Sequence, residues 1–371
     1  MDVTLIVLSA GNSTRFGYPV KKQWITIDDK PLWLYVADRF NEMFSFSKTI
    51  LTANPNEVRL YEKLSDYTII PGSSERQYSL KNALQSIKSE YVLITDVARA
   101  CVPKEVVLRL LENPSDCTVP YITPVDTVVY DEKTIDRNKV KLIQTPQLSR
   151  TEILKKALNT ERLFTDERAA IEAIGGEIKY IKGSKLSKKI TYFDDLDLPC
   201  LKRPSKDVFT GSGYDTHRFE ENKKMYLGGV EIDAGYGFKA HSDGDVAIHA
   251  LIDALLGAAG FGDIGEFFPD DDEKYKNISS VTLLKEVKET LTKTGYEIIN
   301  ADITVIAQKP RLKDYKTKIQ RNLSNLLNAK VNVKATTNEK MGFVGRGEGV
   351  AVLASANLKY KDWYEDYNSR K

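Results

Sequence analysis

Residues 3–17, VTLIVLSAGNSTRFG, decide the fold of the first half of the chain. An apolar run of strand length leads directly into a loop of small residues, and the amphipathic segment 31–44 that follows has the pattern of a helix. Short β-branched runs alternate with longer amphipathic stretches as far as residue 181. This rhythm predicts an α/β fold, with a mostly parallel, Rossmann-like sheet covered by helices on both faces. Such sheets bind ligands at the carboxyl ends of their strands.

A polar, proline-containing stretch, DDLDLPCLKRPSKD at residues 194–207, interrupts this rhythm. A chain of 371 residues is long enough for two hydrophobic cores, so we expect domains at residues 1–210 and 211–371. After the boundary come glycine-rich strands and amphipathic segments at 245–257, 280–294 and 313–327. They predict a second domain of the α/β or α+β class.

The composition is that of an ordinary globular protein, with 42% hydrophobic and 29% charged residues. A net charge of +2 provides no strong field for nucleic acid or membranes, so neither is expected as a partner, whereas anionic small molecules are allowed. Cys101, Cys117 and Cys200 are too widely spaced for a disulfide framework or a metal-binding pair. We expect each to be a small core residue in a reducing cytoplasm. No signal peptide or bilayer-length apolar segment is recognised.

The first candidate site is the loop SAGNSTRFG at residues 9–17, followed by KKQ at 21–23. Backbone N–H groups of such a loop can cradle a phosphate while nearby cations neutralise its charge. The spacing matches neither the Walker A motif nor the dinucleotide fingerprint. A plain turn between strand and helix therefore stays open as an alternative.

Later motifs give this loop a family context. In order, PGSSERQYS (71–79), TDVAR (95–99), DRN (136–138), QTPQ (144–147) and KKIT (188–191) resemble the cytidylyltransferases that join CTP to 2-C-methyl-D-erythritol 4-phosphate in non-mevalonate isoprenoid synthesis. The resemblance covers residues 1 to about 205 and implies a nucleotidyltransferase sheet. Ser13 and Lys21 depart from the usual glycine and proline of the family, which bears on the geometry of the loop.

The resemblance implies a set of roles. Arg15 and Lys22 would stabilise the α-phosphate, and Asp96 would help to hold the sugar phosphate or a magnesium ion. The other implied contacts are Ser79 for the nucleotide, and Arg137 and Lys189, assisted by Thr145 and Thr165, for methylerythritol phosphate. Two alternatives stay open: Asp96 and Arg99 could merely pair at a strand end, and the domain could be a general sugar-nucleotide transferase.

The second candidate site rests on the three histidines of the chain, His217, His241 and His249. In GYDTH at residues 213–217, Asp215 and His217 lie two apart, so on a strand both point to one face. A helix beginning near Asp245 could supply His249 as a third metal ligand, although a lone helical histidine is more often a core residue. One carboxylate and two imidazoles leave a coordination position open, as catalytic zinc requires. His241 lies where an anion would meet the start of this helix, and we expect it to contact substrate.

Around these histidines the sequence resembles the 2-C-methyl-D-erythritol 2,4-cyclodiphosphate synthases. The matching stretches are GYDTH (213–217), LGGV (227–230), AHSDGDV (240–246), LLGA (255–258), GDIG (262–265), FPD (268–270), AQKP (307–310) and KATTNEKMGFVGRGEG (334–349). The resemblance implies that the 2-phosphate of the substrate attacks the β-phosphorus of its own cytidine diphosphate arm and releases CMP.

This second resemblance also implies ligands. Zn²⁺ would bind Asp215, His217 and His249, and Mg²⁺, which Mn²⁺ could replace, would act at both sites and here bind through Glu339. His241 and Thr337 would steady the transition state. The remaining implied substrate contacts are Ser242, Asp263, Ile264, Gly265, Phe268, Asp272, Ala307, Lys313, Thr336, Asn338, Phe343 and Arg346, with Asn338 replacing a common threonine.

The two families imply partners as well. The synthases form trimers with shared active sites and the transferases form dimers in which a residue like Arg137 crosses the interface, so a hexamer is a geometric option for one chain carrying both. A separate kinase would phosphorylate the intermediate between the two reactions. One alternative treats the second domain as a structural zinc module that only oligomerises the transferase. Calcium binding at the acidic run 270–273 is not expected, because the run lacks the spacing of a calcium loop.

Overall fold

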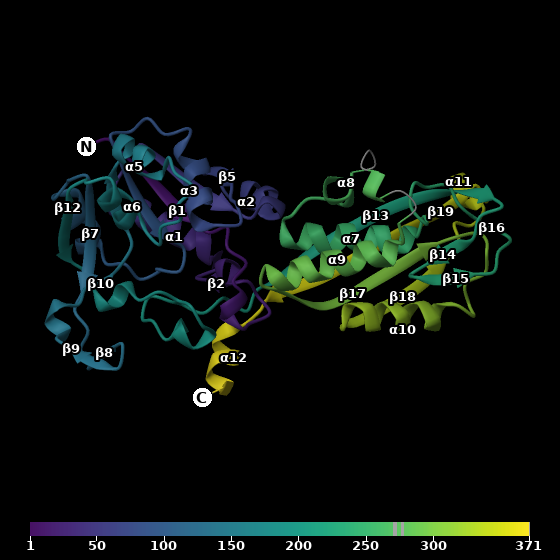
Figure 1. Cartoon of the computed structure of the whole chain (residues 1–371). Helices are drawn as coiled ribbons and strands as arrows, with labels where there is room; N and C mark the ends of the chain where they lie inside the picture. The colour runs from purple at the N-terminus through teal and green to yellow at the C-terminus, as the bar shows by residue number, and fades with distance from the viewer. Residues whose placement is uncertain (270–272, 276–277, 371) are drawn as a thin grey trace. The chain divides into compact units, whose positions relative to one another are not determined.

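The computed structural model describes residues 1–269, 273–275 and 278–370 (Figure 1). The chain forms two compact units, one made of Met1–Pro204 with Asp362–Lys371 and the other of Ser205–Lys361. This division differs from the expected one in two ways. Residue 210 lies inside strand β13 (Val208–Glu221), and the C-terminal segment returns to the first unit.

The first unit contains a mixed sheet with strand order β10-β7-β11-β6-β1-β4-β5 and with β12 beside β7. Its strands are β1 (Val3–Leu8), β4 (Lys48–Ala53), β5 (Thr68–Pro71), β6 (Tyr91–Asp96), β7 (Cys117–Ile122), β10 (Leu142–Ile143), β11 (Gln147–Arg150) and β12 (Ile178–Lys182). The central strand β1 is parallel to β4 and β6, whereas β10 and β11 run antiparallel to their neighbours. Every residue of β1 and β6 is buried, as expected for a sheet covered on both faces.

Several helices of the first unit bury one apolar face, as the periodicity of the sequence predicts. The helices of this unit are α1 (Leu32–Met43), α2 (Val58–Leu64), α3 (Arg76–Leu84), α4 (Lys104–Leu111), α5 (Thr151–Leu158) and α6 (Glu167–Ala173), with α12 (Trp363–Arg370) added from the C-terminus. Short elements without a strong pattern complete the unit: the pair β2 (Thr26–Ile27) and β3 (Lys30–Pro31), and the exposed hairpin of β8 (Val128–Tyr130) and β9 (Lys133–Ile135).

The expectation that all three cysteines are reduced core residues is wrong for two of them. Cys101 and Cys200 form a disulfide with their Cα atoms 5.6 Å apart, and Cys117 is the buried free thiol. The bonded residues are separated by 99 positions, so their spacing in the sequence carried no sign of the pairing. Folding of the first unit brings them together.

The second unit contains a sheet of order β16-β13-β19-β17-β18. Besides β13, its strands are β16 (Tyr236–Phe238), β17 (Tyr296–Ile306), β18 (Lys330–Thr336) and β19 (Gly349–Tyr360), with a separate hairpin of β14 (Met225–Leu227) and β15 (Val230–Ile232). The helices are α7 (Val246–Ala259), α8 (Ile264–Phe267), α9 (Ser280–Lys293), α10 (Lys316–Leu327) and α11 (Gly342–Gly345). Across the described ranges of both units, we find no helix with the length and apolarity needed to cross a bilayer.

Two glycines determine how closely α7 approaches β13. A Cβ atom on Gly211 would lie 2.1 Å from the carbonyl oxygen of Ala254, and one on Gly213 would lie 1.9 Å from that of Ala250. Any side chain there would push the helix away, because these distances are far inside van der Waals contact. Asp215 and His217 continue the same face of the strand, so this close contact brings them toward the beginning of α7.

We expect Gly213→Ala to destabilise the second unit by about 1–3 kcal/mol, since α7 must shift to admit the methyl group. Gly257→Ala is the matched control, because a Cβ there meets only Ser212 O at 4.0 Å and alanine favours the helix. Urea unfolding followed by far-UV circular dichroism should show the loss. Trp24, Trp33 and Trp363 all lie in the first unit, so tryptophan fluorescence should be unchanged. Equal stability of the two variants would contradict the packing role of Gly213.

Candidate active sites

The first candidate site is a cavity of about 320 Å³ at the carboxyl ends of β1 and β6. Parallel pairing aligns Leu8 with Asp96, so the loop after β1 and the end of β6 meet at one edge of the sheet. The cavity is lined by the loop 8–16 together with Lys22, Gln23, Ser73, Ser74, Arg76, Asp96, Val97, Ala98, Lys189 and Thr191. Four residues predicted from the sequence therefore share it: Arg15, Lys22, Asp96 and Lys189.

Asp96 is the negative centre of this cavity. Its Oδ1 atom accepts a hydrogen bond from Arg76 Nε at 3.0 Å, and its Oδ2 atom accepts one from Lys189 Nζ at 2.7 Å. Burial alone would raise the pKa of Asp96, but these two cations hold it well below its ordinary value. Arg76 also pairs with the buried Glu167 at 2.6 Å. Asp96 thus pairs with Arg76 and Lys189, while Arg99 donates to the backbone oxygen of Ser187.

Lys22 is a second cation directed at the cavity. Its Nζ atom donates to Ile190 O at 3.1 Å, which fixes the side chain beside Lys189. Burial lowers the pKa of Lys22 to about 8, and the charges of Lys189 and Arg15 add to this effect. The site therefore concentrates positive charge where a polyphosphate would bind.

The loop between β1 and Lys22 has an unusual backbone. Ser13 has a φ of 57°, a left-handed conformation that costs a non-glycine residue about 1–2 kcal/mol. Its Oγ atom donates to Gln23 Oε1 at 2.6 Å, and Gln23 Nε2 donates to Gly11 O at 2.9 Å. Serine therefore occupies a position suited to glycine, and Gln23 ties the loop together.

Four other predicted residues of this half lie outside the cavity. Ser79 is buried and accepts the N–H of Ser73 at 2.9 Å, so it supports a residue that lines the site. Thr145 is also buried and accepts the N–H of Asp96 at 3.4 Å. Thr165 is exposed before α6, and Arg137 is exposed in the segment after the β8–β9 hairpin, where it donates to Val125 O.

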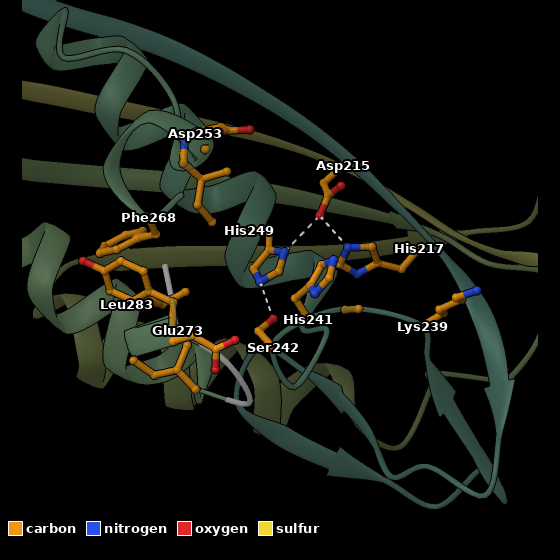
Figure 2. A pocket seen from close by; sticks show the side chains of 15 residues that line it. Asp215, His217, Lys239, His241, Ser242, His249, Asp253, Phe268, Glu273 and Leu283 are labelled. Atoms are coloured by element: carbon orange, nitrogen blue, oxygen red, sulfur yellow. Dashed lines mark hydrogen bonds and ion pairs between the residues drawn. The ribbon is translucent and has the colours of Figure 1, made fainter. Parts of the chain in front are cut away.

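The second candidate site is a cavity of about 580 Å³ that contains Asp215, His217 and His249 (Figure 2). Asp215 Oδ2 lies 3.4 Å from His217 Nε2 and 3.3 Å from His249 Nδ1. One potential ligand atom from each residue lies within 4.8 Å of the others. The strand supplies the first two side chains and the close-packed helix α7 supplies the third.

Hydrogen bonds orient both imidazoles. His217 Nδ1 lies 3.0 Å from Gly244 O, an acceptor, so this nitrogen carries the proton and Nε2 presents its lone pair to Asp215. His249 Nε2 lies 2.9 Å from Ser280 Oγ, and Ser280 Oγ donates to Asp243 Oδ1 at 2.5 Å. Since the serine proton is committed to Asp243, we assign the proton of His249 to Nε2, which leaves the lone pair of Nδ1 facing Asp215.

These three residues fit a metal ion. Asp215 Oδ2 is enclosed and has no hydrogen-bond partner among the described residues. Burial alone would lower the pKa of His249, but the neighbouring carboxylate of Asp215 raises it. Burial alone would raise the pKa of Asp215, but His249 and His217 lower it. The pocket therefore favours a positive charge between them, and the donor set is one that divalent metals bind.

The loop of residues 240–245 before α7 ends in a buried aspartate that supports the fold and begins with residues that face the cavity. Asp245 is completely buried and accepts N–H groups from Gly228 at 2.8 Å, Gly229 at 2.6 Å and Ile248 at 3.0 Å, so it caps α7 and holds the LGGV segment. His241 and Ser242 line the cavity, and Ser242 Oγ lies 3.3 Å from His249 Nε2. His241 is near the three clustered residues and is not one of them.

The structure brings only part of the predicted substrate set to this cavity. Ile264, Gly265 and Phe268 line it, whereas Asp263 caps α8 by accepting the N–H of Glu266 at 2.9 Å. Asp272 lies outside the described residues. The described lining contains none of Ala307, Lys313, Thr336, Thr337, Asn338, Glu339, Phe343 and Arg346. These residues lie around the end of β18 and α11 and in the segment after β17; Thr337 Oγ1 donates to Glu339 Oε1 at 2.6 Å.

Sequence reasoning missed several residues of the two sites. Asp253 lines the second cavity and accepts the N–H of Ile264 at 2.8 Å. Its position four residues after His249, on the same face of α7, was an available signal. Arg76 lay within a recognised motif without being selected. Ser280 is far from His249 in the sequence, and no local pattern reveals their contact.

Comparisons with known proteins find relatives for both halves of the chain. A model of the 2-C-methyl-D-erythritol 4-phosphate cytidylyltransferase family matches residues 3–199, and a model of the YgbB family matches residues 208–359. The bifunctional enzyme IspD/IspF of Aliarcobacter butzleri is 56% identical over 98% of this chain and 99% of its own length. That of Nitratiruptor is 52% identical with the same coverage.

A solved structure extends the similarity to three dimensions. The bifunctional IspDF from Campylobacter jejuni matches with a TM-score of 0.85 and 46% identity, over 98% of this chain and 100% of the solved one. Both halves of the chain are thus matched together, in the same order. The chain belongs to the family of bifunctional IspD/IspF enzymes, and it combines a cytidylyltransferase with a cyclodiphosphate synthase.

Proposed function

We propose that the first cavity transfers CMP from CTP to 2-C-methyl-D-erythritol 4-phosphate through Arg15, Lys22 and Lys189. A phosphate oxygen of the acceptor attacks the α-phosphorus, and pyrophosphate leaves. The nucleophile is already an anion, so the chain needs no general base, and its task is to position the reactants and offset their negative charge. The cluster of cations that line one cavity around the carboxylate of Asp96 is the observation that supports this role.

The remaining residues of this half act at different distances from the reaction. Lys189 binds the acceptor phosphate, and Asp96 orients Lys189 and Arg76 or helps to hold magnesium. Ser79 and Thr145 support the cavity wall from behind, through Ser73 and the backbone of Asp96. Arg137 and Thr165 are exposed, and we propose that Arg137 reaches the acceptor across a dimer interface formed by the exposed hairpin.

We propose that the second cavity cyclises 4-diphosphocytidyl-2-C-methyl-D-erythritol 2-phosphate. An oxygen of the 2-phosphate attacks the β-phosphorus, the bond to the α-phosphate oxygen breaks, and CMP leaves. Asp215, His217 and His249 would hold Zn²⁺, which when bound supplies a Lewis acid at a phosphate oxygen. Three protein ligands leave a position for substrate, which argues against a purely structural zinc module. His241 faces the same cavity and would contact the phosphates.

We propose that a neighbouring copy completes this site. Thr336, Thr337, Phe343 and the other residues outside the cavity would form its cytidine pocket, with Glu339 holding Mg²⁺ or Mn²⁺. One face of the sheet is buried by helices, while Tyr214 and Leu353 pair on the other face and are 55% and 48% exposed. This exposed apolar pair suits a packing contact around a three-fold axis, and combined with a transferase dimer such contacts could generate a hexamer.

The chemistry also suggests a cellular setting. Phosphorylation of the first product must precede cyclisation, so a separate kinase acts between the two reactions and is a candidate partner. We propose a cytoplasmic location because CTP is consumed there. The cysteines no longer support this location, since Cys101 and Cys200 are bonded to each other.

Separate variants should uncouple the two reactions. Lys22→Ala should abolish most pyrophosphate release from CTP and 2-C-methyl-D-erythritol 4-phosphate and leave CMP release by cyclisation unchanged, because only the first cavity loses a cation. His249→Ala should have the opposite effect. Each loss should be about 100-fold or more. Each variant serves as the folding control for the other, and equal rates of CMP release by wild type and His249→Ala would refute the role of the metal site.

The transferase should lose efficiency in alkaline solution. The pKa of Lys22 is about 8, so its positive charge is present below pH 8 and is lost as the pH rises above it. We expect kcat/KM for CTP to fall about tenfold per pH unit above 8, because this ratio reports the free enzyme. Lys22→Arg stays charged and should give a flatter profile in this range, even if its rate is lower. The same steep fall in both proteins would assign the titration to another group.

Metal affinity should depend on Ser280. Removing its hydroxyl deprives His249 Nε2 of its nearer acceptor and leaves only Ser242 Oγ at 3.3 Å, so we expect Ser280→Ala to weaken zinc binding about 10–100-fold in a competition titration with a chromogenic chelator. Ser279→Ala is the matched control, since the adjacent serine makes no side-chain capping bond to α9. Similar zinc affinities for the two variants would show that Ser280 does not orient the ligand.

A further inference from the structure

The C-terminal helix α12 lies in an unexpected unit. The chain leaves the first unit after Pro204, builds the second, and returns at Asp362 to form α12 as part of the first unit. Neither family model reaches this segment, because their matches end at residues 199 and 359. Its role is therefore not given by either enzyme family.

Aromatic and polar contacts attach α12 to the rest of the first unit. Trp363 is almost fully buried and its Nε1–H donates to Thr26 O at 2.7 Å. Tyr18 Oη donates to Asp366 Oδ2 at 2.6 Å. Tyr367 meets the ring of Phe193 edge to face at 6.1 Å, and the Arg370 guanidinium lies 4.4 Å above that ring.

The surface that receives α12 is the back of the first active site. Tyr18 stacks on Phe193 at 4.3 Å, and Phe16 meets both rings edge to face. Phe16 also lines the cavity, next to Arg15. The segment that carries Arg15 and Lys22 is thus held by α12 on both sides of Lys22, at Tyr18 and at Thr26.

This segment has little regular structure of its own. It contains two short turns of 3₁₀ helix, at Thr14–Phe16 and Lys22–Trp24, with left-handed residues at Ser13 and Gly17. Cations stabilise a transition state best when they are fixed beforehand, since no energy is then spent on reorganising them. Burial and the bond to Asp366 raise the pKa of Tyr18 well above its ordinary value, so its hydroxyl remains a donor at every assay pH.

We propose that α12 is a positioning element of the cytidylyltransferase: the Tyr18–Asp366 and Trp363–Thr26 hydrogen bonds hold Arg15 and Lys22 in place for CTP. The C-terminal end of the chain, reached only after the cyclase unit is complete, thereby controls the efficiency of the first reaction. This inference rests on the proposed assignment of cytidylyl transfer to the first cavity.

The test compares variants of the full chain on the two reactions. Asp366→Ala should lower kcat for pyrophosphate release about tenfold, with a smaller change in KM for CTP and unchanged CMP release by cyclisation. Asp366→Asn retains an oxygen that accepts from Tyr18 and should keep at least half of the wild-type kcat. Asn368→Ala, an exposed residue of the same helix, is the matched control and should behave as wild type.

A double-mutant cycle separates positioning from a general loss of folding. Tyr18→Phe removes the donor and keeps the ring, so it should reproduce the loss of kcat, and combining it with Asp366→Ala should add little. Additive losses, or an Asp366→Ala enzyme as active as Asn368→Ala, would overturn the inference while leaving the proposed function intact. A wild-type chain that releases no pyrophosphate would instead overturn the proposed function.

Discussion

The candidate metal site depends on the absence of two side chains. With Gly211 and Gly213 facing Ala254 and Ala250, the backbones of β13 and α7 meet at a distance that no other residue pair would allow. The alternation of the strand then carries the same face forward to Asp215 and His217, and the first turn of the helix carries His249. The candidate metal site is thus a result of backbone packing, because one strand and one helix supply all three of its side chains.

Hydrogen bonds around the site orient the side chains that the packing of β13 and α7 brings together. Gly244 O fixes His217, and the chain from His249 through Ser280 to Asp243 fixes the other imidazole, so both lone pairs converge on one carboxylate oxygen. Ser280 is the first residue of α9, and Asp243 accepts its backbone N–H as well at 3.0 Å. The start of α9 and the loop before α7 therefore hold His249 jointly, and a ligand of α7 depends on a helix beyond it in the sequence.

The sequence allowed prediction of those features that local periodicity encodes. The βαβ rhythm, the shared face of Asp215 and His217, and the helix carrying His249 all follow from spacings of two and about three and a half residues. Contacts between segments distant in the sequence have no such local pattern and could not be predicted. Examples are the contact of Ser280 with His249 and the Cys101–Cys200 disulfide. Strand β11 was not predicted, because its sequence QLSR is short and has no β-branched residue. The left-handed backbone of Ser13 was not predicted either, because serine rarely adopts this conformation.

Under the proposed functions, the two sites offset phosphate charge in different ways. In the first, Arg15, Lys22, Arg76 and Lys189 exceed the charge of Asp96 and Glu167, so the protein itself supplies the positive field for a polyphosphate. In the second, Asp215 lies between two imidazoles, and a metal ion bound by these three side chains would supply the positive charge. A fixed set of side-chain cations suits a reaction between two separate anions, which must first be brought together. Cyclisation joins groups already on one molecule, so the proposed second site has to hold that molecule folded upon itself, and metal ions bound there would offset the charge of its phosphates.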